Sequence, residues 1–239
     1  MNTRWTRTLI LGVALITALL LTGCPAPTPA TPAAPTVVPA TPPPPTPTTP
    51  APVGWTEHQS GEVTISLPAD WEVLALSQGD LQAVFADFQK TNPELAKIIG
   101  SAEALQGVAL WAFQGAGDDA TGADAAFTDN LNIRRSPLGG QKITDMTDVT
   151  PAILDQYRKL GFELGATETD LQIGGYPAAH IAFSYPVILS DGASAKLSGD
   201  QYLVATPTDL WILSYSAGPG NEDALKPVFE QSAQSFRVK

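Results

Sequence analysis

The sequence predicts an α+β fold for residues 54–239, in which helices flank a mostly antiparallel β-sheet. Segments that alternate apolar and polar residues follow one another with short Gly- or Asp-containing turns between them, and such turns join antiparallel strands. Three other regions repeat apolar residues at helical spacing, so each has an apolar face that must cover the sheet. The expected architecture is a layered α+β sandwich in one domain.

The first half of this domain begins with a predicted β-hairpin. Residues 55–58 and 63–67 alternate apolar with polar residues on either side of the Ser60-Gly61 turn, and the hairpin ends at 68–71. The spacing of Leu81, Val84, Phe85 and Phe88 predicts a helix. A second helix begins at Asn92-Pro93, an N-cap followed by proline, and extends to Gly100. A strand is expected at 108–113.

The second half continues with a weakly alternating segment at 127–135 and a helix that begins at Thr150-Pro151 and ends at Gly161. Four strands follow, at 167–173, 178–185, 201–206 and 210–216, with turns at Gly174-Gly175 and near Asp191-Gly192. The last helix begins at Asn221, with acidic residues in its first turn. The inward residues of the two helices are expected to be Ile153, Leu154, Tyr157 and Leu160, and Leu225, Val228, Phe229, Ser232 and Phe236.

Residues 1–23 have the pattern of a secretory signal, with Arg4 and Arg7 before an apolar run. The run is about 16 residues, shorter than the roughly 20 that a transmembrane helix needs. Leu21-Thr22-Gly23-Cys24 resembles the lipobox of bacterial lipoprotein signal peptides. The resemblance implies cleavage between Gly23 and Cys24 and lipid attachment at Cys24, with acyl chains such as palmitate holding the protein on the membrane.

Residues 24–53 form a predicted disordered stalk, since 13 of the 22 prolines lie in 25–52 and almost all other residues there are Ala or Thr. Fully extended, it would span roughly 90 Å, which holds the folded domain away from the membrane. The seven threonines could carry O-linked sugar, or the segment could be a bare spacer.

The domain contains 11 Lys and Arg against 24 Asp and Glu, a formal net charge of −13. This charge repels phosphate backbones and acidic headgroups, which argues against nucleic acid and against docking on an anionic bilayer. The one cysteine allows neither an intramolecular disulfide nor a multi-cysteine metal site.

We expect no catalytic, cofactor or metal site in the domain. The two histidines, His58 and His180, match no metal motif, and no nucleophile elbow is present. The acidic loop 115–124 offers Asp118, Asp119 and Asp124 as calcium ligands, but their spacing departs from the calcium-loop pattern and a solvated turn is the simpler interpretation. The same loop outlines a dinucleotide-binding turn, in which its acids would oppose a pyrophosphate. Of the aromatic residues, Trp71, Trp111 and Trp211 are expected in the core and Trp55 and Tyr176 at the surface.

Four stretches of the domain together resemble the PsbP-like family. The first is 61–71, a strand followed by Pro68 and Trp71. The others are the hairpin 173–178, the strand 210–215 and the C-terminal stretch 229–236. The resemblance implies an α/β/α sandwich and a role in binding or assembly, usually without catalysis.

These features predict a lipoprotein anchored to the cell membrane and facing outward, acting as a non-catalytic binding or assembly module for envelope proteins. Its expected partners are the lipid bilayer, through acylated Cys24, and an envelope protein. The alternative is a small-ligand or metal-binding receptor lipoprotein associated with a transporter. An envelope hydrolase is a third possibility, which would require a cleft of convergent titratable side chains.

Overall fold

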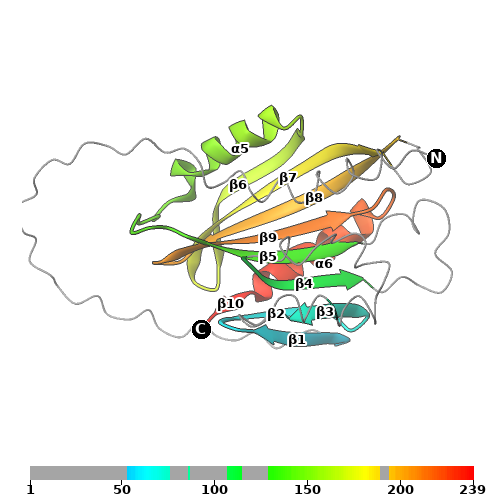
Figure 1. The fold of residues 1–239 in the computed structure, drawn as a ribbon, viewed down its shortest axis with the longest axis horizontal. Coiled ribbons are helices and arrows are strands. Elements are labelled where there is room, and N and C mark those ends of the chain that lie inside the picture. The colour runs from blue at the N-terminus through cyan, green and yellow to red at the C-terminus, as the bar shows by residue number, and fades with distance from the viewer. Residues whose placement is uncertain (1–52, 76–85, 87–106, 115–128, 189–193) are drawn as a thin grey trace, which may run out of the picture. The chain divides into compact units, whose positions relative to one another are not determined.

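The computed structural model describes residues 53–75, 86, 107–114, 129–188 and 194–239, which form two antiparallel sheets with helices packed against them (Figure 1). The helices described in full are the short 3₁₀ helix η3 (Met146–Asp148), α5 (Thr150–Lys159) and α6 (Glu222–Ser235). None of the described helices is long and apolar enough to cross a membrane.

The larger sheet has seven strands in the order β3-β4-β5-β9-β8-β7-β6, and each neighbouring pair is antiparallel. Its strands are β3 (Trp71–Ala75), β4 (Val108–Gln114), β5 (Asn130–Pro137), β6 (Glu163–Ile173), β7 (Tyr176–Ile188), β8 (Ser194–Ala205) and β9 (Asp209–Ala217). Two-residue turns such as Gly174-Gly175, both with positive φ, join neighbouring strands directly. The predicted antiparallel α+β fold is therefore confirmed.

The smaller sheet has three strands in the order β1-β2-β10. These are β1 (Trp55–Ser60), β2 (Val63–Pro68) and β10 (Arg237–Val238). Gly61, with φ of +56°, supplies the left-handed conformation of the turn between β1 and β2. Strand β2 lies in the middle, and its alternate residues Val63, Ile65 and Leu67 are fully buried.

Helices α5 and α6 cover opposite faces of the larger sheet. Tyr157 of α5 donates a hydrogen bond to Gln201 of β8, whereas the next residue, Tyr202, belongs to the core cluster that contains Phe229 of α6. Successive residues of a strand point to opposite faces, so the two helices lie on different sides. We call these the α5 face and the α6 face, and the layers they form are those of an α/β/α sandwich.

The main core lies on the α6 face, beneath α6 and β2. Phe229 of α6 contacts Trp71 edge to face, with ring centroids 6.4 Å apart, and stacks on Tyr215 at 4.8 Å. Trp211 contacts Phe236 at 5.9 Å. The predicted core tryptophans Trp71, Trp111 and Trp211 are 5%, 6% and 2% exposed, as expected. Trp55 and Tyr176, which were expected at the surface, are half-buried instead.

Most predicted elements are present with shifted bounds. Strand β3 was not predicted, because its few alternating residues become a strand only by pairing with β4. Strands β6 and β8 begin four and seven residues earlier than predicted, at Glu163 and Ser194. Their added segments contain one Leu each among polar, Gly and Ala residues, and they form strand because β7 pairs with both. The predicted helices at 81–88 and 92–100, the loop 115–124 and the turn at 191–192 lie outside the fully described residues.

Candidate functional site

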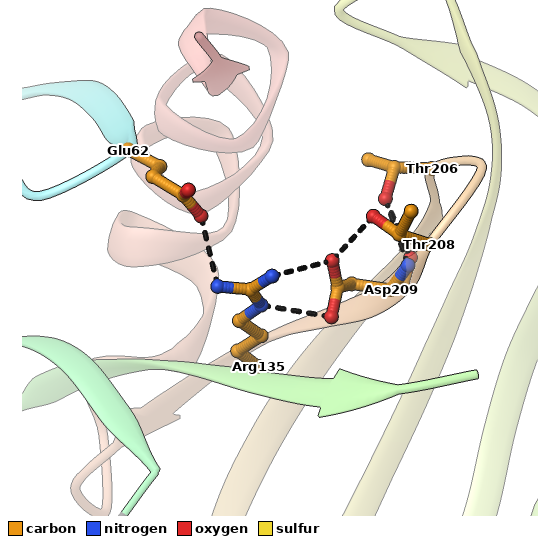
Figure 2. Close-up of polar contacts among 5 residues, drawn as sticks. All are labelled: Glu62, Arg135, Thr206, Thr208 and Asp209. Atoms are coloured by element: carbon orange, nitrogen blue, oxygen red, sulfur yellow. Dashed lines mark hydrogen bonds and ion pairs between the residues drawn. The ribbon is translucent and has the colours of Figure 1, made fainter. Parts of the chain in front are cut away.

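A cluster of ionic and hydroxyl groups, which we call the charged clamp, consists of Glu62, Arg135, Thr206, Thr208 and Asp209 (Figure 2). Arg135 Nε lies 2.8 Å from Asp209 Oδ1 and Nη2 lies 2.9 Å from Asp209 Oδ2, a bidentate pair. Its remaining terminal nitrogen, Nη1, donates to Glu62 Oε2 at 2.9 Å. One guanidinium thus joins the β1–β2 turn to strands β5 and β9.

The turn that precedes β9 places the Asp209 carboxylate for this role. Asp209 N–H donates to Thr206 Oγ1 at 3.1 Å, and the Thr206 hydroxyl donates to the Asp209 carbonyl at 2.9 Å. Thr208 Oγ1 donates to Asp209 Oδ2 at 2.6 Å. Asp209 is only 4% exposed, and the guanidinium of Arg135 compensates the charge of its carboxylate in this site.

The electrostatics of the pair favour the charged form of both groups. The hydrogen bonds from Arg135 are the main cause that lowers the pKa of Asp209 below its ordinary value. The same hydrogen bonds raise the pKa of Arg135. The Arg135 guanidinium also lies 5.8 Å from the centre of the Trp211 ring, which is within the range of a cation–π contact.

The clamp is one of several contacts that fix the smaller sheet on the larger one. Ser60 Oγ donates to the carbonyl of Ala109 in β4, and Ser66 N–H donates to Ser235 Oγ of α6 at 2.8 Å. Lys239 N–H donates to the Glu62 carbonyl at 2.8 Å. The last of these bonds lies within the smaller sheet, whereas the Glu62 and Ser60 bonds tie its β1–β2 end to the larger sheet and the Ser66 bond ties β2 to α6.

A second polar cluster lies on the α6 face. His180 of β7 is 6% exposed, and its Nε2 lies 2.6 Å from Asp200 Oδ1 of β8. The imidazole stacks on the Tyr202 ring with centroids 4.6 Å apart. Burial raises the pKa of Tyr202, and the nearby carboxylates of Asp200, Glu230 and Glu168 add to this shift. His180 is therefore a buried, hydrogen-bonded histidine.

A third cluster is a polar row that crosses the α5 face, one residue per element. Tyr157 OH donates to Gln201 Oε1 at 2.6 Å, and Gln201 Nε2 donates to Ser214 Oγ at 3.0 Å. The row continues with Asn132 of β5, which is in register with Ser214, and then with Trp111 of β4, which is in register with Asn132. Asn132 Oδ1 and Trp111 Nε1 are buried without a hydrogen-bond partner. The bonded half of the row fastens α5 to the centre of the sheet.

The sequence-predicted site residues are distributed as follows. Gly23, Cys24 and the acids Asp118, Asp119 and Asp124 lie outside the described residues. His58 lies on β1 and His180 on β7, in different sheets, so they do not form one site. Burial lowers the pKa of His58, whose Nε2 is buried without a hydrogen-bond partner. In the described part of the chain, no three His, Cys, Asp or Glu side chains are grouped to hold a metal ion.

The charged clamp was missed by sequence reasoning. The available signals were the basic pair Arg134-Arg135 in a weakly alternating strand and the Thr206-Pro207-Thr208-Asp209 turn. Neither signal says that the two meet, since β5 and β9 pair across 74 residues of sequence. Chemically, the clamp differs from the other clusters in reaching solvent: the side chains of Arg135 and Glu62 are 41% and 58% exposed. It therefore positions the smaller sheet while part of it remains open to solvent.

The sequence matches no protein-family model, and no curated protein matches it. Solved structures of similar fold include the cyanobacterial PsbP (CyanoP) of Synechocystis sp. PCC 6803, at 14% identity and a TM-score of 0.44 over 79% of this chain and 95% of that one. The Ran-binding protein Mog1p of Saccharomyces cerevisiae is similar at 11% identity and a TM-score of 0.46, over 77% of this chain and 95% of that one. LpqN, involved in cell envelope biogenesis of Mycobacterium tuberculosis, is similar at 13% identity and a TM-score of 0.45, over 77% of this chain and 90% of that one.

Proposed function

We propose that this chain is a lipoprotein, anchored to the cell membrane through Cys24 and facing outward, whose folded domain is a non-catalytic binding or assembly module for envelope proteins. The stalk at 24–53 holds the domain away from the bilayer. The domain then offers a protein partner a fixed, predominantly acidic surface.

The observation that carries the proposal is how the polar groups inside the domain are used. Arg135 makes three hydrogen bonds to two carboxylates, His180 pairs with Asp200, and Tyr157 bonds Gln201. Each pair joins separate elements, so these groups hold the scaffold together. A surface that is fixed before binding loses little conformational entropy on association, which suits a docking module.

The anchor is supported by the lipobox-like Leu21-Thr22-Gly23-Cys24 at the end of an apolar run. Its test is metabolic labelling of the full-length chain in a bacterial host with a palmitate analogue, followed by membrane fractionation. The wild-type chain should carry the label and sediment with membranes. Cys24→Ser, which keeps a small polar side chain but no thiol, should lose the label. Label retained in Cys24→Ser would overturn the anchor.

The binding role is tested with a photo-crosslinking amino acid placed in the full-length, anchored chain at Glu57, which is exposed on β1. One envelope protein should be recovered repeatedly from intact cells. The control is a chain in which residues 54–239 are replaced by an unrelated domain of similar charge carrying the same crosslinker. Recovery of the same proteins with both chains would overturn the binding role. A thermal-shift panel of metabolites and metals tests the receptor alternative, which predicts a ligand-dependent rise in melting temperature.

A further inference from the structure

Among the described strands, four form sheet edges: β1, β10, β3 and β6. An edge strand exposes unpaired backbone groups, and proteins usually protect it by bulges, Pro, Lys or short length. Strand β6 has register shifts at Leu164/Thr167 and at Glu168/Leu171, which are bulges that block regular pairing. Strand β10 has two residues and β3 has five. The β6 and β10 edges are therefore protected and are not docking candidates, and β3 is set aside because the described part of the chain is interrupted directly after it, at Ala75.

Strand β1 has none of these protections. Its six residues pair with β2 without a register shift, and they include neither Pro, Lys nor Arg. Its Thr56, Glu57 and Gln59 are exposed. Figure 1 shows β1 at the outer edge of the smaller sheet, on the side of β2 opposite β10. It is the one regular edge of more than five residues in the described part of the chain.

The hairpin register shows which backbone groups of β1 are available. Ser60 and Val63 flank a two-residue turn, so they form a hydrogen-bonded pair, and bonded pairs then alternate along the strand. The backbone groups of Thr56, His58 and Ser60 therefore point toward β2. Those of Glu57 and Gln59 point outward. The hydrogen bonds of β2 agree with this alternation. Ser66 is the register partner of Glu57, and its N–H points away from β1 and donates to Ser235.

The charge around this edge selects the kind of partner. Residues 53–75 include no Lys or Arg, but four acids, which are Glu57, Glu62, Asp70 and Glu72. Glu62 is paired with Arg135, so Glu57, Asp70 and Glu72 supply the uncompensated negative charge. All four are exposed. A second copy of the chain would bring the same acids to the edge, and like charges facing each other across strands are unfavourable. A strand that carries Lys or Arg would instead have opposite charges beside its own.

We infer that β1 is a docking edge, to which an extended segment of the partner protein, rich in Lys or Arg, adds as a further strand. Backbone hydrogen bonds from Glu57 and Gln59 would supply affinity, and the surrounding acids would select basic partners. The inference rests on the proposed function and names the surface and the partner chemistry through which that function operates.

The first test uses a capped, fluorescent eight-residue peptide of alternating Lys and Val, with an otherwise identical Glu and Val peptide as its control. Anisotropy with the full-length chain in detergent should show binding of the Lys peptide at least about tenfold tighter than binding of the Glu peptide. Amide hydrogen exchange should show new protection at Glu57 and Gln59. Equal binding of both peptides, or protection confined to other strands, would overturn the inference.

A matched pair of variants separates strand addition from simple charge attraction. Gln59→Pro removes one outward N–H and leaves the β1–β2 hydrogen bonds in place, whereas Gln59→Ala keeps the N–H. Binding of the Lys peptide should weaken about tenfold in Gln59→Pro and remain unchanged in Gln59→Ala. Glu57→Gln should weaken it less, and Asp170→Asn, which removes a charge from the β6 edge, should have no effect. Equal binding by Gln59→Pro and Gln59→Ala would overturn the inference.

If Gln59→Pro lowers the melting temperature, the hydrogen-exchange experiment on the wild-type chain tests the docking edge without any substitution. The crosslinking experiment keeps the two proposals distinguishable. Loss of the crosslinked envelope protein in Gln59→Pro, but not in Gln59→Ala, supports the docking edge. Retention in both variants overturns the docking edge and leaves the binding module standing. Absence of a specific crosslinked protein with the wild-type chain overturns the proposed function instead.

Discussion

Arg135 and Asp209 form a bidentate ion pair, at 2.8 and 2.9 Å, between residues that are 74 positions apart in the sequence. Pro137 is the residue in register with Asp209, and Trp211 is the residue in register with Arg135, so the pair crosses β5 and β9 diagonally. The free nitrogen of the same guanidinium reaches Glu62 in the smaller sheet. One side chain thus fixes both the register of the larger sheet and the position of the smaller one.

Arg135→Met should lower the free energy of unfolding by about 2 kcal/mol, because it leaves the buried Asp209 carboxylate without its charged donors. Glu62→Gln should cost about 0.5 kcal/mol or less, since the Glu62 pair is exposed. Urea unfolding followed by tryptophan fluorescence measures both values. Equal losses in the two variants would show that the buried half of the clamp does not matter more than the exposed half.

The clamp also predicts a pH dependence. Hydrogen bonds from Arg135, and a further one from Thr208, lower the pKa of Asp209 below its ordinary 3.8. The folded state therefore binds this proton less readily than the unfolded state. The resulting stabilisation is fully present above pH 3.8 and is lost as the pH falls through the lower folded pKa.

Asp209→Asn should accordingly lower the free energy of unfolding at neutral pH, and its difference from the wild-type chain should shrink as the pH is lowered below 3.8. Urea unfolding of both proteins over this pH range is the measurement. A difference that stays constant with pH would show that the carboxylate charge is not what stabilises the clamp.

Tyr157→Phe should destabilise the domain by about 1–2 kcal/mol, because it leaves the Gln201 side-chain oxygen buried without its donor. Burial raises the pKa of Tyr157, so its hydroxyl remains a donor at any pH where the domain is folded under ordinary conditions. The double variant Tyr157→Phe/Gln201→Leu should recover part of the loss, since no polar group is then left unpaired. A double variant less stable than Tyr157→Phe would contradict this account.

Gly199→Ala should destabilise the domain by about 1–3 kcal/mol. A Cβ at this position would lie 2.5 Å from Phe183 Cζ, and Phe183 is itself held between aromatic neighbours. Ser198→Ala, one position earlier and half-buried, should have little effect. Phe183→Leu should rescue part of the Gly199→Ala loss in thermal unfolding. The absence of any rescue would show that the cost arises from the backbone rather than from the ring.

Local sequence patterns predicted the elements whose apolar spacing is regular. The buried Val63, Ile65 and Leu67 of β2 follow from simple alternation, and α5 begins at Thr150 as its Thr-Pro signal indicates. Strand order and the clamp could not be predicted in this way. They depend on which strands pair across long sequence separations, and a period-two pattern states only which face is buried, not which neighbour is present.

The same limit explains the polar row. Gln201 and Ser214 each look like an ordinary polar residue of an alternating strand. Only the register of β8 on β9 makes them neighbours, and only the docking of α5 brings Tyr157 to them. Their role is a property of the assembled sheet rather than of either segment.

The one-sided pairing of β1 also determines how the domain bears mechanical load. Tension applied at Val53 reaches β1 first, and β1 is bonded to β2 on one side, whereas β2 is bonded on one side to β1 and on the other to β10. The hairpin would therefore open bond by bond while the core beneath α6 remains intact. A strand added to the free side of β1 would reinforce the point at which the domain yields first.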